Sequence, residues 1–397
     1  MSIVKDRVSN FKFLGISYIL VIFGLFFYSF TQVDLGLTLT RWSVWQVFQK
    51  FFQNIGYFQR PLSTAVYLII VALLFIFYIL FLKLADKKKI TKRQVWTLVI
   101  VTSVILGFSY NAFSYDLFNY IFDAKIITFY HQNPYFHKAL DYPGDPMLSF
   151  MHWTHRTFPY GPSWLLLTTP LSFLGMQIFL PTFFLFKALM TASFLGTVFF
   201  LGKILKKISP ENEIFGLVFF GLNPLVVIES LVSSHNDIVM IFLGILAVYL
   251  LINTKYVRSF FILLLSIGVK FATIFLLPIF ITAMIWQKQK RQISWDKIWM
   301  ASILGLIIAI VFASIRTNFQ PWYLLYIMPF TAFLGRKYFI FIPTIIICFF
   351  SLLVYVPFLY TGNWNPPIPL ILFWITTVSI LLSAFSVLVY SILVKRN

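Results

Sequence analysis

Charged residues are scarce in this chain of 397 residues: they make up 11% of it, with only 12 acidic residues against 31 basic ones. Soluble domains are about a quarter charged, and the mean hydropathy here is +0.88, so a soluble enzyme and a disordered chain are both excluded. The single cysteine, Cys348, cannot form an intramolecular disulfide, which excludes a disulfide-stapled secreted domain. Hydrophobic residues, by contrast, make up 60% of the chain. We therefore predict an all-α, polytopic integral membrane protein.

Apolar segments near bilayer-spanning length, roughly 17–25 residues, recur along the chain. They occupy about 11–30, 61–84, 95–112, 178–202, 213–230, 238–254, 298–315, 338–360 and 370–393. The stretch 259–286, interrupted by Gly268 and Lys270, is predicted to form two short helices or one broken helix, and a further apolar stretch covers 321–335. Residues 164–175 are too few to cross, so we expect a re-entrant or interfacial piece there. About twelve transmembrane helices result.

The positive-inside rule orients these segments. The basic loop 85–93 marks the cytoplasmic side, and alternation from there places 111–162 outside. If 164–175 does not cross, every basic cluster falls inside, and both termini with them. The clusters are Lys5, Arg7 and Lys12; Lys203, Lys206 and Lys207; Lys255 and Arg258; 288–297; Arg336 and Lys337; and Lys395 and Arg396. The net charge of +19 therefore indicates topology and contact with anionic lipids, and no nucleic-acid partner is expected.

Most of the remaining polar residues gather on the outer side. Five acids fall in inside loops, whereas the other seven acids and all five histidines are predicted to lie outside or at the outer membrane edge. Polar groups at membrane depth are costly, so residues kept there indicate a site. The segment 42–52 is predicted to be an interfacial amphipathic helix on the same side. We therefore expect the chemistry at the outer face of the cell membrane.

The outer loop begins with a polar stripe. Asp116, Asn119 and Asp123 recur at helical spacing, opposite Leu117 and Phe118. Such a helix either lies on the membrane with its acids facing a cavity or is an ordinary interfacial helix with a solvated polar face. The pattern alone leaves both interpretations open.

A second polar cluster, residues 229–237, connects two apolar segments. Ser, Asn and Asp suit any tight turn, because they hydrogen-bond their own backbone. A turn does not require Glu229 inside the preceding helix or His235 beside Asp237. An unpaired charge near a helix end is costly, so this cluster implies a partner or a ligand.

Cations follow at two later positions. Lys270 either extends to the headgroups, as long basic side chains do, or holds a lipid phosphate, and Arg316 begins the next outer loop. His152 and His155 have the spacing of two metal ligands, but no cysteine is near and no metalloprotease helix motif is present. We predict no metal and no cofactor.

Taken in order, several short motifs of this chain resemble those of the polyprenol-phosphate-sugar-dependent glycosyltransferases of the GT-C superfamily. The closest similarity is to the polyprenol-phosphate-mannose-dependent α-mannosyltransferases. No single motif is specific, but their order and outer-face placement together are. The motifs are Tyr115–Asp116, Asn133–Tyr135, Pro159–Pro162, Asn223–Pro224 with Glu229, His235–Asp237, Gly268–Lys270 and Gln320–Tyr323.

The resemblance covers about 105–330 and implies a GT-C-type helical bundle with interfacial helices on its outer loop. It divides the chain into three parts. Residues 1–94 are two transmembrane helices with the interfacial helix, an addition of unassigned role. Residues 95–335 are the catalytic core, with the outer loop 111–162, and residues 336–397 are C-terminal transmembrane helices.

The resemblance also implies an inverting transfer from a polyprenyl-phosphate-linked sugar, with mannose the family's commonest sugar, to a glycan, lipid or protein acceptor. An acceptor hydroxyl needs one general base, for which we select Asp116. The leaving phosphate needs cations or oriented donors, for which we select Lys270, Arg316 and His235. The residues expected to bind substrate are Tyr115, Asn119, Asp123, Tyr160, Glu229, Asn236, Asp237, Gln320, Trp322 and Tyr323. We expect the acids and cations to line one cavity open to the outer leaflet.

Two other classes compete with this interpretation. A transporter or flippase of lipid-linked sugars would also collect polar residues among its helices, but nearer the midplane and on repeated, discontinuous helices. A non-catalytic scaffold would not need a concentrated set of acids and histidines.

Overall fold

The computed structural model describes residues 2–395, and the side chains of residues 11–393. Arg396 lies outside the described residues, as do the side chains of Lys5, Arg7 and Lys395. Within the described range the chain folds into helices without a β-strand. This confirms the all-α fold predicted from the sequence.

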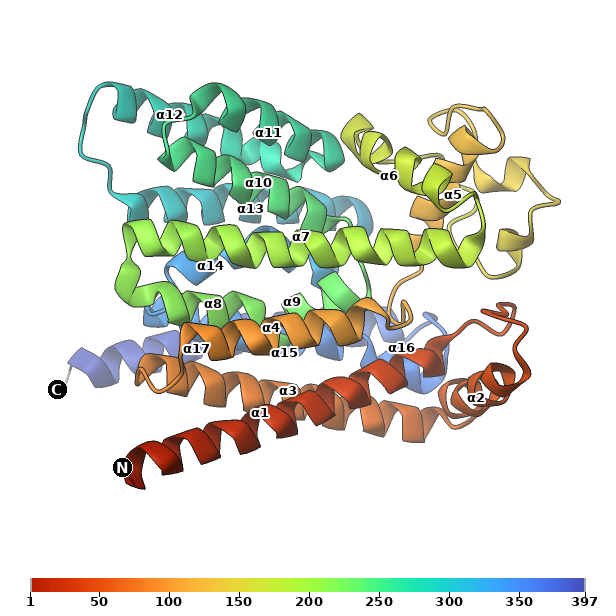
Figure 1. Cartoon of the computed structure of the whole chain (residues 1–397), viewed down its shortest axis with the longest axis horizontal. Coiled ribbons are helices and arrows are strands. Elements are labelled where there is room, and N and C mark those ends of the chain that lie inside the picture. Colours follow the sequence, from red (N-terminus) through yellow and green to blue (C-terminus); the bar gives the residue numbers. More distant parts are fainter. Residues whose placement is uncertain (1, 396–397) are drawn as a thin grey trace.

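The long helices run roughly parallel or antiparallel to one another along the molecule (Figure 1). They are α1 (Ser2–Ser29), α3 (Arg60–Asp86), α4 (Lys92–Gly107), α7 (Phe179–Ile208), α10 (Asp237–Ile252), α11 (Tyr256–Val269), α12 (Leu277–Lys288), α13 (Trp295–Thr317), α15 (Tyr338–Leu353) and α17 (Ile368–Lys395). Short helices fill the gaps: α2 (Ser43–Gln53), α5 (Asp116–Thr128), α6 (Pro162–Leu174), α8 (Glu213–Gly221), α9 (Pro224–Val227), α14 (Met328–Phe333) and α16 (Val356–Thr361).

Among the described residues, seven helices are long and apolar enough to cross a membrane, or eight if the bent pair α8 and α9 counts as one span. The predicted count of about twelve is not confirmed. Helices α10 and α11 have 16 and 14 residues, which is about 24 and 21 Å of helix, short of a hydrocarbon core of about 30 Å. The break at Lys270 leaves α11 short, whereas α12 and the 3₁₀ turn before it form an apolar helix over Phe271–Lys288 that is among the seven.

Ion pairs bring the basic loops to one end of the bundle. Lys92 pairs with Glu213 at 2.5 Å, and Arg336 pairs with Asp86 at 2.8 Å. The amino-terminal and carboxyl-terminal ends of the chain lie at this same end (Figure 1). We call it the basic end, and the opposite end, where residues 111–162 lie, the loop end. The predicted grouping of the basic clusters on one side is therefore what the fold produces.

Helix α6 stays at the loop end, where it packs on α5, α7 and α11. Its 13 residues measure about 20 Å, too little to cross. Helix α7, with 30 residues, then runs from the loop end to the basic end (Figure 1). This is the arrangement expected for residues 164–175.

Helix α5 is largely buried, although a solvated polar face was one interpretation of its stripe. Leu117 and Phe118 are fully buried, and even Asp123 is only 8% exposed. The outer loop folds over the helix through aromatic contacts, such as Phe118 with Phe150 at 5.5 Å between ring centroids. The acids of α5 therefore face the protein interior.

Helix α2 has the reverse arrangement. Two of its three glutamines point inward, where Gln49 donates to the Leu37 carbonyl at 2.6 Å and Gln53 to the Val33 carbonyl at 3.2 Å. Its apolar residues Val47 and Phe51 are 70% and 58% exposed. An apolar face turned outward suits the membrane interface expected for this helix.

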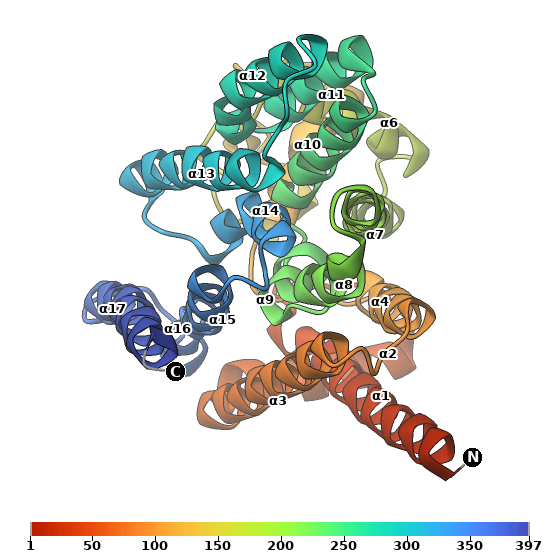
Figure 2. The ribbon, with the colours of Figure 1, turned by 90° about the vertical axis from the view of Figure 1, so that its left-hand side faces the viewer.

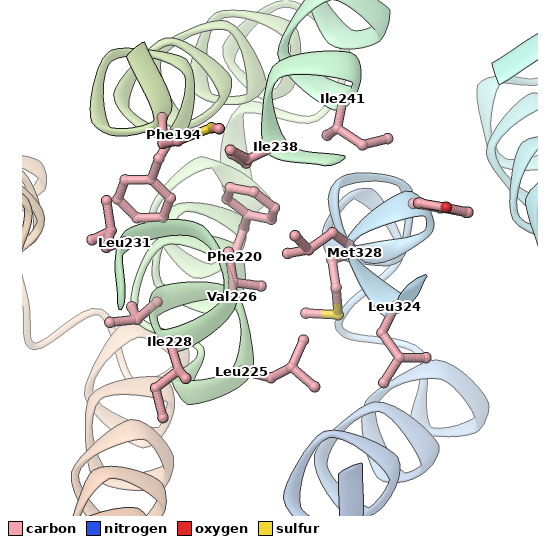
Figure 3. Close-up of a cluster of buried hydrophobic side chains, with 14 of the residues drawn as sticks. Phe194, Phe220, Leu225, Val226, Ile228, Leu231, Ile238, Ile241, Leu324 and Met328 are labelled. Carbon is pink, nitrogen blue, oxygen red and sulfur yellow. The ribbon is translucent and has the colours of Figure 1, made fainter. Parts of the chain in front are cut away.

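Seen end-on, α8 and α9 lie at the centre of the bundle, with α1, α3 and α4 on one side and α10 to α13 on the other (Figure 2). A cluster of buried apolar side chains surrounds this centre. Phe220, Leu225 and Ile228 meet Ile238 and Met328 there (Figure 3). This packing fixes the segment that carries the second polar cluster.

The two ends can be distinguished with introduced cysteines, because the native Cys348 is only 1% exposed and gives little background. A membrane-impermeant thiol reagent added to intact cells should label Leu140→Cys at the loop end and leave Lys206→Cys at the basic end unlabelled. Both positions are exposed. Labelling of Lys206→Cys from outside would reverse the topology.

Candidate active site

The segment 223–237 bends sharply at the centre of the molecule. Asn223 caps α9 by accepting from the backbone N–H groups of Leu225 and Val226, and Pro224 occupies the first helical position. One π-helical turn follows over Ile228–Val232, and α10 begins at Asp237. Ser234 has a φ of +56°, a left-handed conformation that is uncommon for serine. Strain of this kind persists where surrounding contacts hold it, and it clusters at functional sites.

A buried lysine on α7 anchors this turn. The Lys187 ammonium donates to the backbone carbonyls of Leu231 and Val232 and to the Ser109 hydroxyl. Lys187 is 1% exposed, so water does not reach this place and cannot replace the ammonium as the hydrogen-bond donor to these oxygens. Nothing in the sequence pattern indicated this role, because the contact joins residues 44 positions apart.

Three side chains from two segments form a buried chain of acids and histidine. His235 Nδ1 lies 3.5 Å from Asp116 Oδ2, and His235 Nε2 lies 3.3 Å from Glu229 Oε2. Glu229 and His235 are fully buried, whereas the Asp116 side chain is 21% exposed. Burial disfavours the charged imidazole, but the carboxylates of Asp116 and Glu229 outweigh it and raise the pKa of His235 to about 9.

A second ion pair lies in the same region. Lys270 follows the last residue of α11 in an extended conformation, and its ammonium lies 2.7 Å from Asp237 Oδ1. The rings of Tyr323 and Tyr326 lie 5.4 and 5.7 Å from the ammonium, within range of cation–π attraction. Asp237 is fully buried, and Lys270 keeps 21% of its side chain exposed.

Tyr160 joins the two pairs into one site. Burial and, to a lesser degree, the charges of Asp116 and Asp237 raise the pKa of its hydroxyl well above the usual range, and its ring packs edge-on against Tyr120 at 5.3 Å. Asp123 also lies near Tyr160, but it is buried without a cation, and burial raises its pKa well above the usual range. Asp123 therefore favours its neutral form.

Two glycines bring the loop that carries Tyr160 against the segment that carries Lys270. A Cβ on Gly161 would lie 2.3 Å from the Gly268 carbonyl oxygen, and a Cβ on Gly268 would lie 2.2 Å from the Ser163 hydroxyl. The Gly161 backbone N–H also donates to the Val269 carbonyl at 3.4 Å. Only glycine permits this approach.

The site holds an excess of unsatisfied polar atoms. Eight buried side-chain nitrogen and oxygen atoms of residues 229–237 lack a hydrogen-bond partner. Three of them, His235 Nδ1 and Nε2 and Glu229 Oε2, are the atoms of the ion-pair contacts described above. The other five include both polar atoms of the Asn236 amide and Asp237 Oδ2. Each such atom costs about 1–3 kcal/mol. A concentration of this size indicates a place for polar groups of a ligand or for water. No group of three His, Cys, Asp or Glu side chains that could hold a metal is found in the described part of the chain.

The structure brings most of the predicted site residues together, but not all of them. Trp322 stacks on His235 with ring centroids 3.9 Å apart, so one face of its ring is already occupied. Tyr115 lies beside Asp34 and His152 at the edge of the cluster. Asn119 has a buried, unpartnered amide oxygen on α5, whereas Gln320 contacts only the nearby Thr317 carbonyl among its described polar contacts.

Arg316 does not join the others, because it is exposed at the end of α13. The cluster is also nearly enclosed, since the side chains of Glu229, His235 and Asp237 have no exposed surface. A hollow of about 450 Å³ that is lined by Thr254–Arg258 lies elsewhere. The sequence predicted a single cavity open to the outer leaflet. The structure instead brings acids and cations together in a cluster that is nearly enclosed.

Residues 19–287 match the model of a family described as alpha-(1->6)-mannopyranosyltransferase, N-terminal domain. The chain belongs to this mannosyltransferase family. It is therefore a glycosyltransferase by family, acting on a sugar donor and an acceptor. No curated protein and no solved structure matches the chain.

The family match contains Asp116, Glu229, His235, Asp237 and Lys270. It begins at residue 19, within α1, so the carboxyl-terminal part of α1 and all of α3, which the sequence left as an addition, fall inside it. It ends before α13, so Arg316 and residues 320–323 lie beyond it.

The glycine contact can be tested by adding one methyl group. We expect Gly161→Ala to lower the thermal unfolding temperature of the purified protein, since overpacking costs about 1–3 kcal/mol. Gly144→Ala is the matched control, because a Cβ there meets nothing within 4 Å. Equal unfolding temperatures for the two variants would contradict the close approach of the two segments.

Proposed function

We propose that this protein transfers a hexose, mannose by family, from a polyprenyl-phosphate donor to a glycan, lipid or protein acceptor. The transfer takes place at the outer face of the cell membrane and inverts the anomeric centre. The observation that carries the proposal is the partly exposed Asp116 carboxylate, 3.5 Å from a buried histidine, at the end of the bundle opposite the basic loops.

The chemistry is a single displacement. The acceptor hydroxyl oxygen bonds to the anomeric carbon while the bond from that carbon to the phosphate oxygen breaks. The hydroxyl proton passes to the Asp116 carboxylate, and polyprenyl phosphate leaves with the bonding electrons. Attack from the face opposite the phosphate inverts the configuration.

Asp116 is the better base of the two acids on α5. Its side chain is 21% exposed and can meet a substrate, whereas Asp123 is buried and favours its neutral form. The stripe seen in the sequence could not separate them, because both acids occupy the same helix face.

The departing phosphate needs positive charge that is already in position. Lys270 supplies an ammonium held by Asp237 and still partly exposed. His235 supplies a second positive charge beside the base. Arg316 is exposed at the end of α13, outside the cluster. It can contact the donor only at the edge of the site, so we assign it a weaker role.

A membrane position suits such a donor. Its prenyl chain stays in the bilayer, so only the phosphate and the sugar need to reach the protein. Asp116 belongs to the segment 111–162 at the loop end, and an acid in that segment matches a donor at headgroup depth better than a transport path through the midplane.

The proposal is tested by incubating the purified protein with a panel of polyprenyl-phosphate sugars and an extracted envelope acceptor. Acceptor-dependent release of polyprenyl phosphate is expected, with the largest rate for the mannose donor. Movement of the donor between leaflets of proteoliposomes without release would instead identify a flippase and overturn the transferase proposal.

Asp116→Asn should lower turnover about 10²–10⁴-fold while donor binding is retained, because the amide cannot accept the hydroxyl proton. Asp123→Asn should retain most activity, since burial raises the pKa of this carboxyl group and so already disfavours the charge that the amide removes. Turnover and donor binding are measured separately for each variant. A dead Asp123→Asn beside an active Asp116→Asn would move the base to Asp123.

Lys270→Gln should weaken binding of the anionic donor and slow the departure of phosphate, so KM rises and kcat falls together. Lys125→Gln is the control, because Lys125 is also an ion-paired lysine of the loop end but contacts Asp145. Kinetics of both variants on the same donor decide the assignment. If the two lysines proved equivalent, Lys270 would not be the phosphate ligand.

A further inference from the structure

The proposed reaction assigns no task to the C-terminal helices, yet one of their residues reaches the site. Tyr355, directly before α16, donates from its hydroxyl to Glu229 Oε1 at 2.9 Å. Tyr355 is 6% exposed and Glu229 is fully buried. The contact joins residues 126 positions apart, and nothing in the sequence marked Tyr355.

We infer that Tyr355 and Glu229 are positioning residues that hold the His235 ring against the Asp116 carboxylate, so that the C-terminal helices complete the active site. This inference rests on the proposed function for its meaning in catalysis. Its geometry can be tested independently of any donor.

Both carboxylate oxygens of Glu229 are already engaged. Oε1 accepts from Tyr355, and Oε2 lies 3.3 Å from His235 Nε2. With both oxygens in use and no exposed surface, Glu229 is better placed to orient His235 than to contact substrate. The sequence had assigned Glu229 to substrate binding, and we propose the positioning role in its place.

Contacts restrain the imidazole ring of His235 both at its edge and on its face. Asp116 and Glu229 lie at its two nitrogens, and Trp322 stacks on its face at 3.9 Å with an angle of 18° between the rings. The next charges, Asp237 and Lys270, are paired with each other. The ring of His235 therefore has one orientation, and the position of the Asp116 carboxylate follows from it.

The charge of Glu229 has a direct consequence for His235. A buried imidazolium needs nearby negative charge, because burial alone favours its neutral form. Two carboxylates raise the pKa of His235 to about 9, so it is charged at neutral pH. Removing the charge of Glu229 lowers this pKa, and the imidazole then loses its proton at a lower pH.

Helices from both ends of the chain support the contacts of Tyr355 and of the loop before Asp116. The Tyr355 ring packs on Phe113 at 5.2 Å between centroids, and Phe113 packs on Tyr28 of α1 at 6.2 Å. The Ser29 hydroxyl accepts from the Tyr110 backbone N–H at 3.0 Å. The loop before Asp116 is therefore supported by α1 and by the C-terminal helices together.

The first measurement is an NMR titration of histidine-labelled protein in detergent, with the His235 signal assigned by its loss in His235→Gln. Glu229→Gln should move the His235 titration to lower pH by more than one unit, and Tyr355→Phe should move it in the same direction by less. Tyr67→Phe is the matched control: this buried tyrosine donates to the Leu352 carbonyl at 2.8 Å, so one buried hydrogen bond is lost there too. Its titration should equal that of the wild type.

The second measurement is the pH profile of kcat/KM. In Tyr355→Phe, the decline of kcat/KM on the basic side of the profile should begin at a lower pH than in the wild type. At neutral pH a roughly tenfold loss is expected, as for one hydrogen bond to a charged group. Tyr67→Phe should keep the wild-type profile. Thermal unfolding of both variants monitors their stability.

The outcomes of these measurements distinguish the positioning role of Tyr355 and Glu229 from the proposed function. An unchanged His235 titration in both Glu229→Gln and Tyr355→Phe would overturn the positioning role, whatever the activity. A shifted titration in a protein that transfers no sugar would retain the arrangement and reject the proposed function. Equal profiles for Tyr355→Phe and Tyr67→Phe in an active enzyme would also overturn the inference.

Discussion

A polar turn held at the centre of an apolar bundle is the constraint on which the rest of this structure depends. Residues 229–237 carry two acids and a histidine with no exposed surface, and isolated charges of this kind are costly away from water. The surrounding elements supply the compensation: Lys187 from α7, Lys270 from the end of α11, Tyr355 from the C-terminal region and Asp116 from α5. Helices distant in the sequence therefore meet here because the turn needs their polar groups.

The same constraint explains why the bundle is irregular. A continuous helix through residues 213–252 would satisfy its own backbone but would leave no turn to present His235. Instead the segment breaks at Asn223–Pro224 and again at residues 233–236, and α11 ends at Lys270. Each break shortens a helix below bilayer length and places one functional side chain.

The arrangement also separates two kinds of charge. At the basic end, ion pairs such as Arg336 with Asp86 are partly exposed and contribute little to stability. In the site, the pairs are buried, and removing one member would leave a charge uncompensated. We propose that the first kind sets the orientation in the membrane and that the second kind prepares a site for an anionic, sugar-bearing donor.

The all-α membrane fold and the candidate acids follow from the sequence alone, because both depend on local composition: long apolar runs form helices in lipid, and polar residues persist in them only for a reason. The order of motifs was enough to indicate the glycosyltransferase family. The sequence could not decide which acid of the α5 stripe is exposed, since Asp116 and Asp123 share one helix face and differ only in what covers them. Nor could it place Tyr355 on Glu229 or Lys187 on the carbonyls of residues 231 and 232. Those contacts join segments 44 to 126 residues apart, and only tertiary packing brings them within hydrogen-bond distance.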